Sequence, residues 1–574
     1  MESLKKILQK YPDLKTLNEY VKKQTGLSNF VTSNEDLEFL KKLLDTPVIK
    51  ENNNKDFGEY QTSLHLTDQI CKYLKEINYQ PEIIFEPTCG EGSFILSAIQ
   101  NFPTLKHVYC LDVQRKFEFY FKLNLLKLSF EKDFNIIVEF YRDSIFNHEF
   151  SKQFKEIMND NKELLILGNP PWVTNTQLSS MNSENLPLKT NLKSLKGIEA
   201  ITGRANFDIT EAILIQISRI FSDLKCKIAI LCKRSVIRNI VRDGSKLDLN
   251  FSNINSLHID AKKEFNINAN AALLVADVGS DNGTTCRVSS FYTKKDLHEF
   301  GWITKQRFVS DVVNYKKFEY LDGGHEIESP ILEWRQGVKH DAIKVMVLKT
   351  GPNGNMINGL NEILDFENDL LYPFLRGSTL NKSIIHKEPP PNLLILTQKA
   401  LNEDTIAISS QYPKLWAYLL AHSDILDHRK SQIYKNRPRF SVFGIGEYAF
   451  RPFKIGISGF HKIPKFSLIY PINNKPVMLD DTSYYLSFNN INDAFFIWIL
   501  LNSEEVKHFL NSISFLDSKR PFTKRTLMRI DIQKLITQTS FESIMKIYNE
   551  NLQEIFEYKF NIDDFNNFKK RMNE

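Results

Sequence analysis

Asn169, Pro170, Pro171 and Trp172 are consecutive residues that follow the apolar run at 164–167 after a single glycine, Gly168. An asparagine oxygen can accept a hydrogen bond from a planar NH2 group, and so can the carbonyl of the following proline, whose fixed φ aims it in advance. Two such acceptors favour a more tetrahedral nitrogen with its lone pair directed at an electrophile. The pattern is typical of a site that methylates a planar amine. A polar turn stiffened by two prolines is the alternative.

Trp172 supplies an aromatic face beside these acceptors. If the amine belongs to a nucleobase in a duplex, the base must be flipped out of the stack, at a cost of a few kcal/mol. Stacking on an aromatic ring returns about 1–3 kcal/mol per base. Phe265, beside a later predicted strand, is a candidate for a second face, and an ordinary core phenylalanine is its alternative.

A second group of residues suits a cofactor that contains a nucleoside. The apolar run at 83–85 is followed by a loop with Glu86, Pro87, Gly90 and Gly92, and then by a helical run. Glycines at such a turn allow a ligand to approach the backbone closely, and the start of the helix offers free N–H groups. Taken alone, the loop is equally compatible with an ordinary strand-to-helix turn.

Two aspartates stand at the ends of further predicted strands. Asp112 follows the run at 107–111, 20 residues after Gly92, a spacing that suits a carboxylate accepting hydrogen bonds from both ribose hydroxyls. Asp143, followed by Ser144, comes after the third run and could bind the amine of a cofactor adenine. Either aspartate alone could cap a helix. Three strand ends with suitable chemistry, in this order, favour a cofactor site.

These residues require a scaffold that brings strand ends together. Between about 56 and 295, helical segments separate most of a series of short apolar runs, at 83–85, 107–111, 135–138, 164–167, 227–231 and 271–275. Such alternation predicts an α/β domain with a mainly parallel sheet, in which ligands bind at the carboxyl ends of the strands. We place this domain at 51–295, beginning with a polar linker at 51–55 and preceded by a helical extension at 1–50.

The chain after 295 is rich in aromatic residues and lacks the alternation, which predicts a second, mixed α+β domain at 296–574 with a helical tail from about 540. Residues 428–465 contain nine Lys or Arg against one acid, with seven aromatics interleaved. This composition suits phosphate contacts, and a solvated basic face is the alternative. The candidate DNA-binding residues are Arg429, Lys430, Lys435, Arg437, Arg439, Arg451 and Lys454, and in a second basic cluster Lys519 and Arg520.

Composition, net charge and cysteine spacing exclude several classes of protein. A net charge of +5, 42% hydrophobic residues and 25% charged residues are ordinary for a globular chain of 574 residues. The six cysteines form no CxxC pair and no zinc pattern, so we expect no metal site, no disulfide framework and a cytoplasmic location. No signal peptide or membrane span is expected. No Asp…Glu-x-Lys arrangement follows a strand, which argues against DNA cleavage by this chain.

At these motifs the chain resembles the amino-methyltransferases of DNA, specifically the N6-adenine group with motif order gamma from restriction–modification systems. Residues 57–63, Phe-Gly-Glu-Tyr-Gln-Thr-Ser, are similar to the family's N-terminal cofactor segment G-x-[YF]-x-T-P, which assigns Tyr60 and Thr62 to the cofactor. This chain has Ser63 where the family often has proline. Glu86 stands where an acid begins the glycine loop, and residues 206–209, Asn-Phe-Asp-Ile, match a segment whose aspartate helps to position cofactor or substrate.

The resemblance implies a Rossmann-like class I methyltransferase domain with a seven-stranded sheet. It implies S-adenosylmethionine as the methyl donor, touched by Asn169 as well as the loops, and N6 of a flipped adenine in double-stranded DNA as the acceptor. A cognate restriction endonuclease is a candidate partner. The same amine chemistry would serve cytosine N4, RNA or a protein glutamine amide, and these remain alternatives, as does a non-catalytic DNA-binding subunit.

Overall fold

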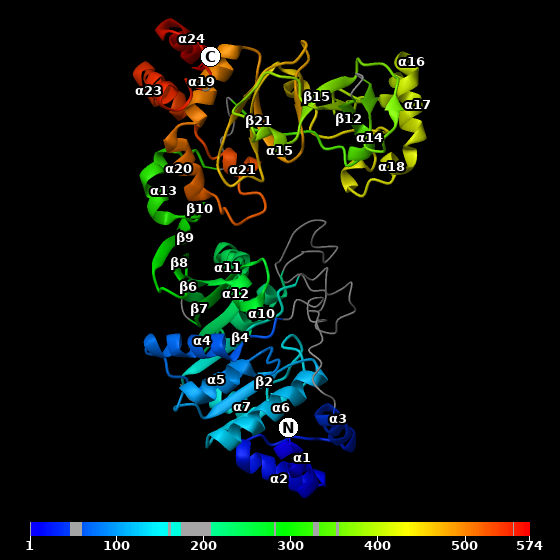
Figure 1. Ribbon diagram of the computed structural model, residues 1–574. Helices are drawn as coiled ribbons and strands as arrows, with labels where there is room; N and C mark the ends of the chain where they lie inside the picture. Colours follow the sequence, from blue (N-terminus) through cyan, green and yellow to red (C-terminus); the bar gives the residue numbers. More distant parts are fainter. Residues whose placement is uncertain are drawn as a thin grey trace. The chain divides into compact units, whose positions relative to one another are not determined.

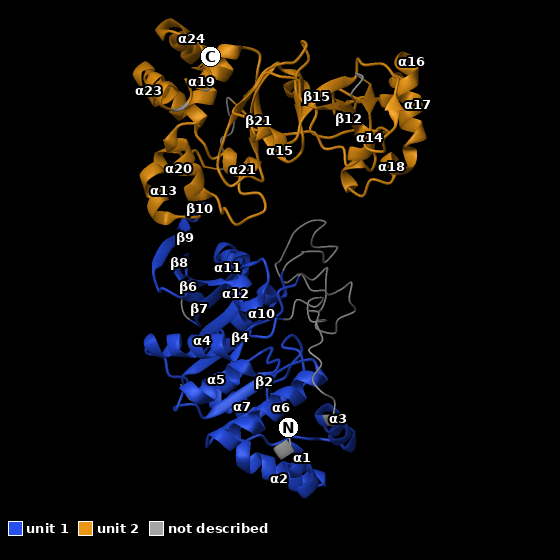
Figure 2. Cartoon of the chain, viewed as in Figure 1, with its two compact units in different colours: residues 1–308 blue, residues 309–574 orange. Residues whose placement is uncertain are grey.

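The computed structural model describes residues 2–45, 60–158, 162–173, 208–224, 226–279, 283–324, 332–351, 355–554 and 556–573. The chain divides into two compact units, residues 1–308 and 309–574 (Figure 2). Each unit is described by itself below. The predicted linker at 51–55 and the first residues of the predicted cofactor segment, 57–59, lie outside the described residues.

Unit 1 is built on one large sheet with the strand order β10-β9-β8-β6-β7-β5-β4-β1-β2-β3 (Figure 1). The strands are β1 (Ile83–Glu86), β2 (His107–Leu111), β3 (Ile137–Tyr141), β4 (Leu164–Gly168), β5 (Cys226–Lys233), β6 (Phe251–Asp260), β7 (Asn270–Val278), β8 (Thr285–Ser290), β9 (Asp296–Thr304) and β10 (Arg307–Val309). Pairings among β1 to β5 are parallel, whereas β7 runs antiparallel to both β5 and β6. The predicted mainly parallel α/β architecture is confirmed.

The strand order explains where a ligand can bind. From β1 the chain proceeds outward through β2 and β3, then returns to place β4 on the other side of β1. The connections after β1 and β4 therefore diverge, which opens a crevice at the carboxyl ends of these two strands. Glu86 ends β1, and Asn169 directly follows β4. The glycine loop and the Asn-Pro-Pro-Trp segment thus leave the sheet side by side.

Two expectations about this sheet need correction. Six apolar runs were assigned as strands and all six are strands, but β6 was missed because its sequence, FSNINSLHID, is half polar. Among the described residues the sheet has ten strands rather than seven, since β8, β9 and β10 extend it beyond β6. Because β9 begins at Asp296, a boundary at 295 would cut the sheet, and the first unit continues to 308.

Within the described residues of unit 1, one helix comes directly before β1, and the helices after it lie between strands in sequence. They are α4 (Leu64–Glu76), α5 (Ser93–Asn101), α6 (Arg115–Glu131), α7 (Lys152–Met158), α10 (Ile209–Ile220), α11 (Arg234–Leu247) and α12 (Ala261–Phe265). The N-terminal helices α1 (Glu2–Lys10), α2 (Leu14–Thr25) and α3 (Asn34–Asp45) join the same hydrophobic core through Leu17, Val21 and Leu40. Leu27 also pairs with Val138 at the edge strand β3, so the N-terminal segment is an integral part of unit 1.

Unit 2 contains a five-stranded sheet, β11-β21-β18-β19-β16, and a six-stranded sheet, β14-β13-β12-β17-β15-β20. The strands are β11 (Arg335–Gln336), β12 (Val347–Thr350), β13 (Met356–Ile357), β14 (Ile363–Leu364), β15 (Leu371–Leu375), β16 (Ile385–His386), β17 (Asn392–Ile395), β18 (Phe453–Ser458), β19 (Ser467–Ile469), β20 (Met478–Leu479) and β21 (Ser483–Phe488). The two sheets share a small core, to which Leu375 and Leu479 contribute from the six-stranded sheet and Ile469 and Tyr485 from the five-stranded sheet.

The described part of unit 2 also contains α-helices. They are α13 (Val312–Phe318), α14 (Ile343–Met346), α15 (Gly377–Leu380), α16 (Ile408–Gln411), α17 (Pro413–Ala421), α18 (Ser423–Asp427), α19 (Ile491–Leu501), α20 (Glu504–Ile513), α21 (Lys524–Leu527), α22 (Ile532–Gln538), α23 (Phe541–Asn551) and α24 (Ile562–Asn573). The predicted helical tail corresponds to α23 and α24. Within the described ranges, no helix combines the length and the apolar character needed to traverse a lipid bilayer.

Candidate active site

A pocket at the carboxyl ends of β1, β2, β3 and β4 gathers nearly all residues that the sequence assigned to a cofactor. It is lined by Tyr60, Thr62, Glu86, Pro87, Gly90, Asp112, Asp143, Ser144 and Asn169. The sequence reasoning missed Gln61, Thr88, Cys89, Ser93, Phe94, Val113, Gln114, Phe117 and Pro171, which also line it. Most of these are immediate neighbours of assigned residues, and no sequence motif distinguishes them as cofactor-binding residues.

The glycine loop is held in a left-handed conformation and tied to β2. Gly90 has a φ of +55°, and its N–H donates to Asp112 Oδ2 over 2.8 Å. The other Asp112 oxygen accepts from the N–H of Gln114 at 2.9 Å. Each carboxylate oxygen can accept a further hydrogen bond, so Asp112 can both brace the loop and face a ribose.

Gly92 has a different role from the one that the sequence suggested. It does not line the pocket, and it caps helix α5 with a φ of +82°. A Cβ atom at this position would lie 2.2 Å from Cδ2 of Phe121, a ring with no exposure to solvent. Gly92 is therefore required by the packing of α5 against α6, and its link to a cofactor is indirect.

Asp143 is oriented by a histidine that the sequence reasoning did not find. His148 Nδ1 lies 2.8 Å from Asp143 Oδ2, and its Nε2 lies 2.7 Å from the hydroxyl of Tyr109. The second Asp143 oxygen accepts from the N–H of Ser144 at 2.7 Å. His148 is buried while the Asp143 side chain remains 43% exposed, so the histidine fixes an accessible carboxylate at the pocket.

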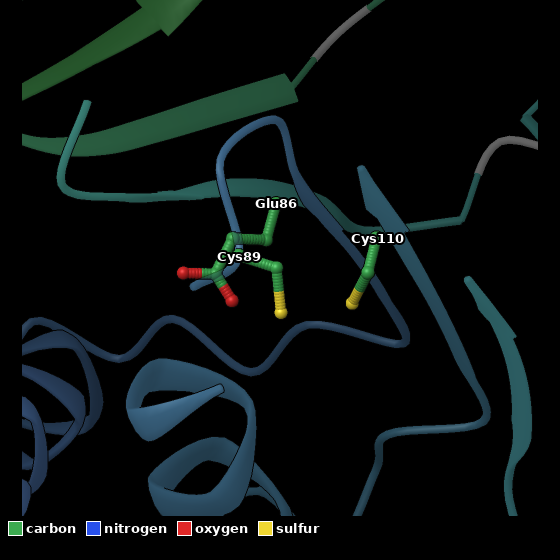
Figure 3. A group of neighbouring side chains, drawn as sticks. All are labelled: Glu86, Cys89 and Cys110. Atoms are coloured by element: carbon green, nitrogen blue, oxygen red, sulfur yellow. The ribbon is translucent and has the colours of Figure 1, made fainter. Parts of the chain in front are cut away.

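Glu86, Cys89 and Cys110 form a buried group, of which Glu86 and Cys89 also line the pocket (Figure 3). Their potential ligand atoms lie within 4.8 Å of one another. Burial raises the pKa of the Glu86 carboxyl and of both thiols. Metals bind thiolates rather than thiols, so a metal ion at this group would have to displace the protons of both cysteines. A protonated Glu86 can instead donate a hydrogen bond, and it faces the pocket.

Asn169 is oriented by the segment that precedes α4. Its Nδ2 donates to the backbone carbonyl of Tyr60 at 2.8 Å and to Thr62 Oγ1 at 3.2 Å. A carbonyl oxygen can only accept, so the Asn169 amide must turn its NH2 group toward Tyr60. Its Oδ1 then points the other way, where it is buried and has no partner in the described chain. The site therefore holds a buried acceptor without a donor.

Three carbonyls of this loop, which come after Pro170, each accept a hydrogen bond from a donor elsewhere in unit 1. Pro171 O accepts from the Thr210 hydroxyl at 3.1 Å, Trp172 O from Lys233 Nζ at 2.6 Å and Val173 O from the N–H of Ile209 at 2.9 Å. The Pro170 carbonyl is not among them. The loop is thus clamped on one side of the two proposed acceptors.

Trp172 and Phe265 do come together, but they stand outside the set that lines the pocket. Their ring centroids are 5.2 Å apart at an interplanar angle of 69°, and Tyr60 lies 5.8 Å from Trp172. Only 4% of Trp172 is exposed. A base can stack on the Trp172 face only if one of these rings moves, which corrects the expectation of an open aromatic face.

The basic residues assigned to DNA differ in their accessibility. Lys454 lies inside β18, is 1% exposed and donates to the Arg451 carbonyl, so it cannot reach a phosphate. Arg429 is half-buried and donates to the carbonyls of Leu426, His340 and Ser441. Both belong to the packing of unit 2 rather than to a binding surface. The remaining residues are Lys430, Lys435, Arg439, Arg451 and Lys519, which are exposed, and Arg437 and Arg520, which are half-buried.

A comparison with known proteins identifies the family. The chain is 36% identical to the type II methyltransferase M.NspV of Nostoc sp. over 487 residues, which are 84% of this chain and 98% of the relative. The chain belongs to the type II methyltransferases. No protein-family model matches it.

Solved structures similar to this methyltransferase include the type IIL restriction-modification enzyme MmeI in complex with DNA. That likeness has 11% identity and a TM-score of 0.48, and covers 98% of this chain and 81% of the other. A methyltransferase subunit of a type I restriction-modification system from Streptococcus thermophilus shares 11% identity at a TM-score of 0.26, with 40% and 47% of the two chains covered.

S-adenosylmethionine is the methyl donor of this type II methyltransferase, and the pocket fits it. Glu86 Oε2 and Thr88 Oγ1 are buried at the pocket without partners in the described chain. Unpaired buried polar atoms cost about 1–3 kcal/mol each, so a polar ligand is favoured here. Asp112 and Asp143 stand where they can hold its ribose and its adenine, and the bare backbone at Gly90 permits close approach.

Proposed function

We propose that this methyltransferase modifies N6 of an adenine flipped out of duplex DNA, as the modification component of a restriction–modification system. The observation that carries the proposal is the orientation of Asn169. Its NH2 group is engaged by Tyr60 and Thr62, and its Oδ1 is buried, unpaired and beside the cofactor pocket. Such an atom awaits a donor, and the exocyclic amine of a nucleobase is a donor of the right geometry.

The reaction then needs little proton chemistry from the protein. Asn169 Oδ1 accepts one amine hydrogen and the Pro170 carbonyl accepts the other, which directs the nitrogen lone pair away from both. S-adenosylmethionine, when bound, supplies an electrophilic methyl group. As the N–C bond forms and the S–C bond breaks, the nitrogen becomes positively charged and acidic, and its proton passes to solvent. The two acceptors stabilise the positive charge that develops on the amine.

Duplex DNA as the substrate is supported by the charge of unit 2. Lys430, Lys435, Arg451 and Lys519 are exposed, and the described chain gives none of these four an acidic ion-pair partner. Arg439 is exposed as well, but it pairs with Asp427 at 2.7 Å. Near Lys519, the exposed ring of Phe460 lies 4.9 Å from the Arg520 guanidinium, so cations and aromatic surface occur together. Phosphate contacts require such cations, and bases stack on such rings.

The decisive experiment uses the full chain with tritiated S-adenosylmethionine and three substrates: unmethylated genomic DNA, total RNA and a glutamine-bearing protein. Nucleosides from the labelled DNA are separated by chromatography. We expect N6-methyladenine, and we expect Asn169→Ala to lose at least about 100-fold in rate, a typical cost of removing one such acceptor or donor. If the labelled nucleoside were N4-methylcytosine, the substrate base would be cytosine rather than adenine. Label found only in RNA or only in protein would refute the proposal.

A further inference from the structure

The Asn-Pro-Pro-Trp loop is fastened by a lysine that no motif of the sequence assigned. Lys233 is the last residue of β5, and its Nζ donates to the Trp172 carbonyl at 2.6 Å. The same Nζ lies 2.8 Å from Asp208 Oδ2. The side chain is 29% exposed, so the ammonium group is largely removed from water while it makes both contacts.

The backbone of Lys233 is fixed by the sheet. Strands β4 and β5 pair in parallel from Leu164 and Cys226 to Gly168 and Ile230. Lys233 therefore ends β5 next to the point where β4 passes into Asn169. Strand β7 holds the other side, since Ala271 pairs with Lys233 itself. Because the sheet fixes the backbone of Lys233 on both sides, the hydrogen bond from its side chain can hold the loop in a fixed position relative to the sheet.

Asp208 is equally well placed. It caps helix α10, with Oδ1 accepting from the N–H of Thr210 at 3.1 Å, and it is only 9% exposed. One carboxylate oxygen thus serves the helix and the other serves Lys233. The pairing compensates the charge of the lysine, which makes a partly buried ammonium group tolerable at this position.

We infer that Lys233, supported by Asp208, is a positioning residue for methyl transfer: it sets the backbone of Trp172 and thereby the aim of Asn169 and Pro170. The inference rests on the proposed function of that loop. It also refines the predicted role of the 206–209 segment, of which Asn206 and Phe207 lie outside the described residues. Asp208 acts on the substrate loop through Lys233 rather than by touching the cofactor.

The test uses Lys233→Met, which keeps the length of the side chain and removes its charge, and Asp208→Asn, which keeps a helix-capping oxygen. Displacing a reacting group by about 1 Å can cost 100-fold in rate. We expect kcat to fall at least about 30-fold in Lys233→Met, with the Kd for S-adenosylmethionine and the melting temperature changed little. Lys233→Arg should recover most of the loss.

A matched control lies on the same strand. Lys227 pairs with Asp277, and no hydrogen bond or ion pair joins it to residues 169–173, the part of the loop that the structure describes, so Lys227→Met should leave kcat unchanged. A readout other than turnover is 2-aminopurine placed at the target base, whose fluorescence on binding should change in Lys233→Met and not in Lys227→Met. An unchanged kcat and an unchanged 2-aminopurine signal in both Lys233→Met and Asp208→Asn would refute the inference while leaving the proposed function intact. A wild-type chain that labels no DNA would refute the proposed function first.

Discussion

Asn169 and Tyr60, 109 positions apart in the sequence, are joined by a 2.8 Å hydrogen bond from the Asn169 side-chain amide to the Tyr60 carbonyl. The bond decides which end of the amide faces the substrate. It also connects a segment that lines the cofactor pocket to the residue proposed to hold the substrate amine. The Tyr60 acceptor is a backbone carbonyl, so mutation of the Tyr60 side chain cannot remove it. The second acceptor, the Thr62 hydroxyl, can be removed by mutation, and it therefore offers a test of how Asn169 is oriented.

Thr62→Val should weaken the orientation of Asn169 without abolishing it. Thr62 Oγ1 accepts from Asn169 Nδ2 at 3.2 Å, and loss of one such hydrogen bond costs about 0.5–1.5 kcal/mol. We expect kcat to fall about 2- to 12-fold, the same energy expressed as a rate. Thr62→Ser keeps the hydroxyl and should retain nearly the full rate. Equal rates for Val, Ser and wild type would show that Thr62 does not influence Asn169.

Phe265 lies in an aromatic cluster with Trp172 and Tyr60, and it is the candidate for a second ring on which the flipped base stacks. Trp172 is packed edge-on against Phe265, and both contact Tyr60. Phe265→Leu keeps apolar volume but removes the ring, so binding of S-adenosylmethionine should be preserved. If Phe265 provides a face for the flipped base, the affinity for DNA with 2-aminopurine at the target should fall by about 1–3 kcal/mol. A variant that binds such DNA like wild type would reduce Phe265 to a packing role.

The two glycines of the cofactor loop should respond differently to alanine. At Gly92 a Cβ atom would meet the Phe121 ring at 2.2 Å, whereas at Gly90 it would meet the flexible end of Gln61 at 3.0 Å. Overpacking of this kind costs about 1–3 kcal/mol, in addition to the cost of a positive φ in alanine. Gly92→Ala should therefore lower the melting temperature more than Gly90→Ala. In calorimetric titration, Gly90→Ala should lower the affinity for S-adenosylmethionine more than Gly92→Ala does, because Gly90 lines the pocket and Gly92 does not.

The sequence was informative where a motif is contiguous. Glu86, Gly90, Asp112, Asp143 and Asn169 each follow an apolar run, and parallel pairing brings those ends to one edge. It was uninformative about partners from distant segments, because neither His148 nor Lys233 stands in a pattern that a single sequence reveals.

The basic segment shows a second limit of sequence reasoning. Lys454 and Arg451 differ by three positions, yet one is buried in β18 and the other is exposed. Counting charges along a segment cannot separate them, since Arg451 precedes β18 whereas Lys454 lies within this strand, which the tertiary structure buries on both faces. The half-polar strand β6 was missed for a similar reason, because its pairing with β7 and β8 is a property of the folded sheet.

Salt dependence should separate surface cations from buried ones. Each phosphate contact releases counterions and contributes about 0.9 to the slope of log K against log salt. Lys430→Ala and Lys435→Ala together should lower that slope by roughly 1–2 and weaken binding to all DNA sequences alike. Lys454→Met should leave the slope unchanged, since Lys454 is buried. Fluorescence anisotropy with a labelled duplex at several salt concentrations provides the measurement, and a slope that does not differ between the double variant and wild type would exclude these two lysines from the interface.

Lys454 should instead control how the stability of unit 2 depends on pH. Burial lowers its pKa from 10.5 to about 7, while the unfolded chain keeps an ordinary lysine pKa. Between these two values the unfolded state binds more protons than the folded state, so the free energy of unfolding must rise with pH through this window and level off below it. Lys454→Met should remove that rise.

The same variant should gain stability at low pH. Charging a buried lysine whose carbonyl acceptor among the described residues is that of Arg451 costs on the order of 5 kcal/mol for a pKa lowered this far. Methionine has a similar length and no charge to desolvate, so Lys454→Met should be more stable than wild type at and below about pH 7, with the difference shrinking as the pH approaches 10. Guanidinium unfolding between about pH 6 and pH 9 measures both effects. Lys430→Met, at an exposed position of the same basic segment, is the control. A Lys454→Met chain with the wild-type pH profile would mean that Lys454 keeps its charge in the folded protein.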